Sequence, residues 1–166
     1  MADCKPISTP LDQNLKLRFD EGEVLDDATM YRRIVGSFIY MTILRLDLSY
    51  AVGLVSEFMQ LPRKPHLDAV RRILRYVRAT LDYALFYDAS TQVQVHGYTD
   101  SDWVGSISDR RSTSGYMFSF GSAVVTRSSK KQSTIALSST KAEYRGAVVA
   151  AGEVAWLEML LRDLEI

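Results

Sequence analysis

The sequence predicts an α+β protein, in which a small helical bundle precedes an antiparallel sheet with packed helices. Apolar residues recur every three to four positions before residue 80, which is the period of a helix. They alternate with polar residues after residue 92, which is the period of a strand, and a helical period returns after residue 140. With 47% hydrophobic and 24% charged residues, the chain is typical of globular proteins.

Residues 1–27 differ from the rest in composition. They contain Pro6, Pro10 and an acidic cluster between Asp20 and Asp27, without an apolar period. We expect an acidic tail or a loosely docked arm. The whole chain carries 20 basic and 20 acidic residues, so it is not a uniformly basic DNA-coating protein. Its single cysteine, Cys4, excludes an internal disulfide or a cysteine-based zinc site.

Residues 28–88 form a predicted helical region. The first helix is expected over 28–45, with Ile34, Phe38 and Met41 on one face, and the second over 47–59. The third follows Pro65 and is the clearest, because apolar residues between Leu67 and 77 face one way while arginines lie on another face. Short breaks between these helices favour a small bundle.

Residues 89–166 form a second predicted region. Strands are expected from Val93 to 98, over 116–120, and over 123–126 with an interrupted continuation at 133–137. Short connections favour antiparallel pairing. Two helices should follow, one over 140–151 and a final one between Val154 and Leu164.

Two acidic residues in this second region suggest metal chemistry. Asp100 falls near the end of the first strand, and Glu143 falls in the first turn of the helix after the sheet. A strand carboxylate and a helix carboxylate suit Mg²⁺, which takes one or two carboxylates together with water and phosphate oxygens. The spacing from Thr140 to Glu143 also fits a helix capping box, so both interpretations stand at this point.

Several long strings resemble the C-terminal part of the polyprotein of copia-type LTR retrotransposons, an element class abundant in plants. The most specific string is GYTDSDW at 97–103. In order along the chain, the strings lie at 31–40, 72–77, 97–103, 109–116, 128–132 and 136–144.

This resemblance implies that residues 28–88 are similar to the thumb and tether of a reverse transcriptase. Residues 89–166 are similar to an RNase H domain, which has an antiparallel sheet with packed helices. It also implies that Asp100 and Glu143 are metal-binding catalytic carboxylates for Mg²⁺ or Mn²⁺. Asp102 belongs to the same string as Asp100 and is a further catalytic candidate.

The sequence departs from that family at three places. Lys141 stands where the family usually has Glu, and Arg127 stands where it usually has Trp. The family's third catalytic Asp lies on a later strand, and this sequence stops at Ile166 before such a strand. We therefore expect the C-terminal strands to be missing and the first strand to be an exposed edge. Exposed edges pair with other chains, which predicts a homodimer.

Basic residues cluster in both regions despite the zero net charge. The candidate nucleic-acid-binding residues are Arg71, Arg72, Arg75, Arg78, Arg110, Arg111, Arg127, Lys130, Lys131 and Lys141. Such clusters contact phosphates, and A-form duplexes are recognised mainly by shape and backbone. The expected partner is therefore a duplex, either an RNA–DNA hybrid or double-stranded RNA, including viral RNA.

Two functions remain open from the sequence. One is a divalent-metal-dependent endoribonuclease of RNase H type that cleaves RNA in a duplex. The alternative is a non-catalytic duplex-binding or interaction module derived from a retrotransposon. The sequence has no apolar run long enough to cross a membrane and no signal-peptide pattern at its start, so the expected location is the cytoplasm or nucleus.

Overall fold

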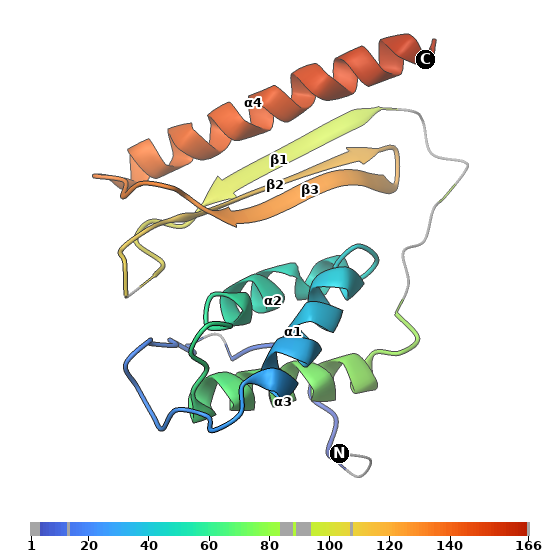
Figure 1. Cartoon of the computed structure of the whole chain (residues 1–166). Helices are drawn as coiled ribbons and strands as arrows, with labels where there is room; N and C mark the ends of the chain where they lie inside the picture. The colour runs from blue at the N-terminus through green and yellow to red at the C-terminus, as the bar shows by residue number, and fades with distance from the viewer. Residues whose placement is uncertain (1–3, 13, 84–87, 89–93, 107, 166) are drawn as a thin grey trace. The chain divides into compact units, whose positions relative to one another are not determined.

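The chain forms two compact units, Met1–Leu85 and Phe86–Ile166. The structure is a computed structural model that describes residues 4–12, 14–83, 88, 94–106 and 108–165. The first unit is helical and the second is built on a three-stranded antiparallel sheet (Figure 1). This mixture of helix and sheet confirms the α+β class. The strand start expected at Val93 lies outside the described residues.

The first unit packs its helices around one apolar core. Its elements are α1 (Thr29–Met41), the short 3₁₀ helix η1 (Leu46–Leu48), α2 (Ser49–Ser56) and α3 (Lys64–Ala79). Helix α3 follows the predicted period, since Val70 and Ile73 are fully buried. The core also holds Tyr31, whose hydroxyl donates to the Val55 carbonyl at 2.6 Å.

The first two helices are shorter than the sequence predicted. Helix α1 ends at Met41 rather than near 45, and the segment expected to be helical over 47–59 is η1 followed by α2, which ends at Ser56. Arg45 explains part of this difference. Its guanidinium pairs with Asp47 at 2.7 Å and donates to the Thr80 carbonyl at 2.9 Å, which fixes a turn between the two helices.

The N-terminal segment is held against the helices of this unit. Leu11 and Leu17 are buried in the helical core. Arg72 donates to the Thr9 hydroxyl at 3.0 Å, and Arg75 donates to the Lys5 carbonyl at 3.0 Å. The N-terminal segment is therefore a packed arm. The apolar side chains that anchor it, Leu11 and Leu17, follow neither a helical nor a strand period in the sequence.

His66 has a structural role in the first unit. Its ring is buried and stacks on Phe58 with centroids 3.8 Å apart. Nδ1 accepts a hydrogen bond from the Arg63 amide at 2.9 Å, and Nε2 lies 3.0 Å from the Arg18 carbonyl. Burial lowers the pKa of His66, which keeps the imidazole neutral.

The second unit consists of a sheet and one long helix. The strands are β1 (Val95–Ser101), β2 (Thr113–Phe120) and β3 (Ala123–Lys131), in the order β1-β2-β3. Helix α4 (Ser139–Asp163) lies along the sheet and contacts β1 and β2 (Figure 1). Both β1 and β3 are thus edge strands among the described residues.

Two predicted elements of this unit were wrong. Strand β3 continues to Lys131 because its polar half pairs with β2 from Thr113 to Met117, whereas residues 133–137 form no strand. Helix α4 is one helix of 25 residues rather than two. No proline interrupts it, and a glycine at 152 breaks no backbone hydrogen bond, so the helix continues.

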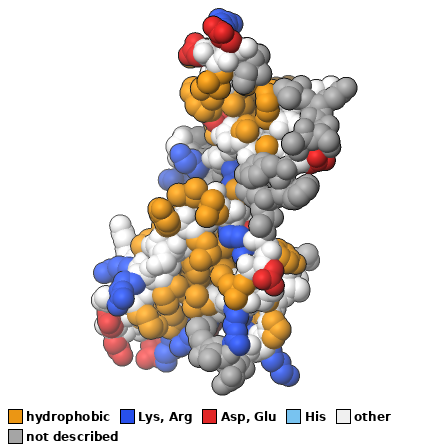
Figure 2. Space-filling model, turned by 90° about the vertical axis from the view of Figure 1, so that its right-hand side faces the viewer, with side chains coloured by type: hydrophobic (Ala, Val, Ile, Leu, Met, Phe, Trp, Pro, Cys, Tyr) orange, Lys and Arg blue, Asp and Glu red, His pale blue; other side chains and the backbone are white. Residues whose placement is uncertain are grey.

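The second unit has a small core. Phe118, Ala150 and Leu157 are buried, and Tyr116 and Val154 pack against them. Many of its large apolar side chains are instead exposed, including Tyr98 (63%) and Leu164 (57%). Figure 2, viewed from the side on which α4 ends, shows hydrophobic side chains at the surface of this unit. A surface of this kind is typical of a site that contacts another molecule.

Helix α4 approaches the sheet closely at Gly146. A Cβ atom there would collide with the Ser101 hydroxyl and would lie 3.4 Å from the Ser114 hydroxyl. Space, rather than backbone conformation, therefore favours glycine here, because any larger residue would force the Ser101 side chain to shift. This contact fixes the distance between α4 and β1.

The two glycines of α4 make a matched test of this packing. Gly146→Ala should lower the free energy of unfolding by about 1–3 kcal/mol because the added methyl group overpacks the contact with Ser101. Gly152→Ala should raise it by about 0.5–1 kcal/mol, since a Cβ there meets nothing within 4 Å and alanine favours the helix. Urea unfolding followed by tryptophan fluorescence measures both, because Trp103 and Trp156 are the only tryptophans and lie in this unit. If Gly146→Ala and Gly152→Ala changed the free energy of unfolding equally, the close packing of α4 against Ser101 would be contradicted.

Candidate nucleic-acid interface

A basic groove runs between α4 and the β2–β3 side of the sheet. It has a volume of about 550 Å³ and is lined by thirteen residues, none of which is acidic. Its three cationic side chains are Lys130, Lys131 and Arg145, from β3 and α4. Around them lie Tyr116, Tyr144, Gln132 and several serine and threonine hydroxyl groups.

The cations of this groove are positioned by neighbouring groups. Lys131 Nζ donates to the Ser106 hydroxyl at 3.2 Å and to Asp109 at 3.3 Å. Partial burial opposes ionisation of Asp109, but the hydrogen bonds from Ser106 and the Arg111 amide, with the charge of Lys131, hold its pKa below the ordinary value. Arg145 donates one of its five N–H groups to the Thr134 carbonyl at 3.1 Å. Lys130 is exposed to solvent.

Neutral polar groups complete the groove. Burial and the nearby Glu153 carboxylate raise the pKa of Tyr116, so its phenol stays protonated. Gln132 Nε2 donates to the Ser114 hydroxyl at 2.7 Å and to the Ala142 carbonyl at 3.0 Å. Its Oε1 is buried and accepts no hydrogen bond within the described part of the chain. An unpaired buried acceptor is costly to the fold.

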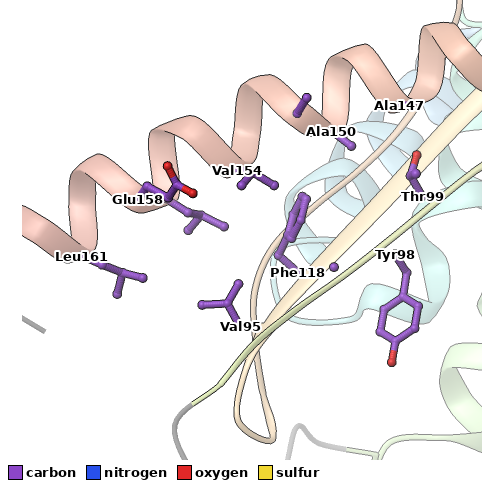
Figure 3. A pocket seen from close by; sticks show the side chains of 12 residues that line it. Val95, Tyr98, Thr99, Phe118, Ala147, Ala150, Val154, Glu158 and Leu161 are labelled. Atoms are coloured by element: carbon purple, nitrogen blue, oxygen red, sulfur yellow. The ribbon is translucent and has the colours of Figure 1, made fainter.

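The predicted catalytic residue Asp100 lies on β1 and is exposed. Thr99 and Ser101 lie next to Gly146 of α4, and Figure 3 shows Thr99 directed toward that helix and Tyr98 directed away from it. Because side chains alternate along a strand, Asp100 belongs to the same face as Tyr98, opposite α4.

Glu143 lies in the first turn of α4 and is also exposed. The expected capping box from Thr140 to Glu143 is wrong, since the N-cap is Ser138 and its hydroxyl accepts a hydrogen bond from the Lys141 amide at 3.2 Å. Glu143 therefore has no part in the helix cap. It lies one helical turn before Gly146, the residue that meets Ser101.

Asp102 has a structural position. Its Oδ1 accepts a hydrogen bond from the Thr113 amide, and its own amide donates to the Thr113 carbonyl at 3.1 Å. These bonds close the loop that joins β1 to β2. Among the described residues, no group of three or more His, Cys, Asp or Glu side chains could hold a metal ion.

The predicted basic residues fall in different surroundings. On α3, Arg71 pairs with Asp68 at 3.0 Å, while Arg72 and Arg75 hold the N-terminal arm. Arg78 is exposed at the end of the same helix. The Asp68 carboxylate neutralises part of the positive charge of the α3 face, and the arm occupies donors of Arg72 and Arg75. An RNA ligand on this face would compete with the arm.

The remaining candidates belong to the second unit. Arg110 and Arg111 lie in the loop before β2, where Arg111 is 3.7 Å from Asp109, and Arg127 is half-buried on β3. Lys141 is exposed in the first turn of α4. Of the ten predicted residues, the basic groove brings together only Lys130 and Lys131.

Sequence reasoning missed several residues of the groove. Arg145 belongs to the basic cluster in the sequence but was not among the candidate contacts, and Tyr116, Gln132 and Tyr144 were not considered as binding residues. These side chains come from β2, from the segment after β3 and from α4, so no periodic pattern joins them. The SSKKQ string at 128–132 was the one available signal.

Comparisons with known proteins identify the ancestry of the chain. It is 41% identical over all 166 residues to the Pol polyprotein from transposon RE1 of Arabidopsis thaliana, and 40% identical over 171 aligned positions to that from transposon TNT 1-94 of Nicotiana tabacum. It is also 41% identical over 133 residues to secreted RxLR effector protein 161 of Plasmopara viticola, spanning 94% of that protein. The chain is related to the Pol polyproteins of copia-type retrotransposons.

The chain corresponds to a small part of these long polyproteins. It spans 11% of the length of the RE1 polyprotein and 13% of the TNT 1-94 polyprotein. No family model and no solved structure matches this retrotransposon-derived sequence. In the described residues, no helix combines the length and the apolar character needed to cross a membrane.

Replacing the acidic residues one at a time separates structural from exposed carboxylates. Asp102→Ala should lower the free energy of unfolding of the second unit by about 1–2 kcal/mol, because the Thr113 amide loses its acceptor. Glu143→Gln should change it by less than about 0.5 kcal/mol, since that side chain is exposed. Tryptophan fluorescence in urea gives both values. A larger loss with Glu143→Gln than with Asp102→Ala would contradict this assignment.

Proposed function

We propose that the chain is a duplex-binding module with an RNase-H-like second unit, and that the basic groove contacts the sugar–phosphate backbone. The observation that carries this proposal is the groove itself, whose lining includes Lys130, Lys131 and Arg145 and no acidic residue, while Asp109 beside it pairs with Lys131. Nucleic-acid affinity depends mainly on cations that neutralise phosphates. A net charge of zero does not oppose binding, because the positive side chains are gathered in one place.

The uncharged groups of the groove favour RNA. The serine, threonine and tyrosine hydroxyl groups of the lining provide donors and acceptors for ribose 2′-hydroxyl groups, which line the minor groove of an A-form duplex. Contacts of this type carry little sequence information. The proposed partner is therefore an A-form duplex of any sequence, either double-stranded RNA or an RNA–DNA hybrid.

This relationship supports the RNase-H-like interpretation of the second unit. The relatives are Pol polyproteins, and the strings that carry the resemblance lie on β1, β2, β3 and the start of α4. The first unit, by the same argument, derives from the thumb and tether of the reverse transcriptase. The duplex would be its natural ligand in the parent polyprotein.

Binding through the groove can be measured with single substitutions. Lys130→Ala and Arg145→Ala should each weaken binding to a fluorescent RNA duplex and lower the slope of log affinity against log salt by about one. The control is Lys16→Ala, which removes an exposed cation from the first unit. Fluorescence anisotropy at several salt concentrations, with double-stranded RNA, RNA–DNA hybrid and single-stranded RNA, gives the values. The proposal fails if Lys16→Ala weakens binding as much as the groove variants.

A second candidate function is divalent-metal-dependent cleavage of the RNA strand. The observation that favours it is the neighbourhood of Asp100 and Glu143: Asp100 directly precedes Ser101, and Glu143 lies one turn before Gly146, which meets Ser101. Both offer the carboxylate oxygens that Mg²⁺ and Mn²⁺ prefer. Asp100 nevertheless lies on the face of β1 opposite α4, the helix that carries Glu143, so we derive no hydrolytic step from this arrangement.

Cleavage assays decide between the two functions. Because Asp100 lies on the face of β1 opposite α4 and Glu143 lies on α4, we expect the wild-type chain to bind labelled RNA–RNA and RNA–DNA duplexes without cutting them in Mg²⁺ or Mn²⁺. Asp100→Asn and Glu143→Gln are the matched variants. Cutting by the wild type that both variants abolish would establish the nuclease and overturn the purely binding role, whereas equal cutting by all three proteins would indicate a contaminant.

A further inference from the structure

The basic groove, on the β3 side of α4, combines its cations with an apolar and aromatic lining. Helix α4 contributes Tyr144, Val148 and Val149 to this lining. Tyr144 is 70% exposed and Val148 is 71% exposed, so both present apolar surface to solvent. Residues four apart lie together on a helix, so Tyr144 is next to Val148 and Arg145 is next to Val149. Exposed apolar surface beside polar groups is typical of a binding site.

The sheet forms the other side of the groove. The Ser114 hydroxyl lies close to Gly146, so Ser114 points toward α4. Side chains alternate along a strand, and Tyr116 therefore points the same way. Lys130 pairs with Ser114 across the sheet, and directly opposite residues share a face, so Lys130 points toward α4 as well. The rings of Tyr116 and Tyr144 thus line one groove from the sheet and from the helix.

The groove is too small to enclose a duplex. Its volume of about 550 Å³ falls among small-molecule pockets, which measure roughly 300–1,000 Å³. A duplex can therefore lay only its backbone along the cations, since the faces of its bases are covered by stacked neighbours. An unpaired nucleotide has open base faces, and aromatic side chains stack on such faces. The interior of the groove therefore suits a nucleotide outside the paired region.

We propose that the basic groove binds an unpaired nucleotide that adjoins the duplex, with the base stacked on Tyr144 and the phosphate held by Lys130 and Arg145. This inference rests on the proposed duplex-binding function and names the substrate more closely, as an RNA duplex with a single-stranded end or fork. A hydrogen bond to the Thr134 carbonyl at 3.1 Å holds Arg145 at the groove. The planar set of N–H groups on an arginine matches the oxygens of a phosphate.

The two parts of the groove act on different parts of one nucleotide. Every base has a π face, so a tyrosine ring stacks on any of the four bases. Cations beside the ring bind phosphates irrespective of sequence. Loss of the Lys130 charge should therefore weaken the binding of every RNA ligand. Loss of the Tyr144 ring should weaken the binding only of ligands that have an unpaired base.

Three labelled RNA duplexes of equal paired length test this inference by fluorescence anisotropy on the full chain. One is blunt, one has a short unpaired fork at one end, and one has the same fork made of abasic nucleotides. The two forks carry equal charge, so the ratio of their affinities measures the contribution of the bases alone. The wild type should bind the normal fork on the order of tenfold more tightly than the abasic fork, because one base stacks on an aromatic ring.

Substitutions at Tyr144 assign this preference to the groove. Tyr144→Ala should reduce the affinity ratio to about one, whereas Tyr144→Phe should keep it because the ring remains. Neither change should alter binding of the blunt duplex, since Lys130 and Arg145 are still present. Tyr98→Ala is the matched control, because Tyr98 is also an exposed tyrosine of the second unit and is directed away from α4 (Figure 3). This control should leave the ratio unchanged.

The outcomes separate this inference from the proposed function. If the wild type binds both forks equally while Lys130→Ala weakens binding of all three duplexes, the inference is overturned and the duplex-binding function stands. If the wild type binds none of the three duplexes, both are overturned. A preference for the normal fork that persists in Tyr144→Ala, or that Tyr98→Ala abolishes, also overturns the inference.

Discussion

The second unit depends on the close contact between α4 and β1 at Gly146. A three-stranded sheet has a face to cover, and here one 25-residue helix covers it. The helix reaches the sheet because Gly146 has no side chain where Ser101 and Ser114 lie. Its position creates two grooves of opposite character, a basic one on the β3 side and an apolar one on the β1 side.

The two grooves differ in what they can bind. Phosphate contacts require cations at the surface, which the β3 side provides with Lys130, Lys131 and Arg145. The apolar groove lies on the other flank of α4 and has Glu158 as the one charged residue in its lining, so it takes no part in the proposed phosphate contacts.

Much of the architecture could be predicted from the sequence. Helix α3 and strand β2 follow clear apolar periods, and the turn at Gly121 follows from its glycine, which has a positive φ. The polar half of β3 could not be predicted in this way, because Arg127–Lys131 have no alternation and pair through the backbone of β2. The continuity of α4 was also missed, since a glycine within a helix weakens the local signal but costs little where tertiary contacts hold it.

The candidate site was harder to predict than the fold. The sequence strings that contain Asp100 and Glu143 indicate a retrotransposon origin, but they do not place the two side chains. The alternation of side chains along β1 places Asp100, and the start of α4 at the Ser138 cap places Glu143. Asp102 looked similar to Asp100 in the sequence, but its carboxylate accepts a hydrogen bond from the backbone amide of Thr113. The arginines of α3 formed the clearest basic stripe, and two of them hold the N-terminal arm. In each of these examples, the surroundings of the side chain depend on tertiary contacts, which leave no local pattern in the sequence.

Hydrogen–deuterium exchange with and without an RNA duplex tests the central claim most directly, because it maps the ligand on the intact chain. The account predicts that the duplex slows exchange in peptides that cover 128–134 and 141–149, which form the two sides of the basic groove. Peptides from the apolar side of α4 should be unchanged. Protection confined to α3, with none at 128–134, would contradict the account and move the binding site to the first unit.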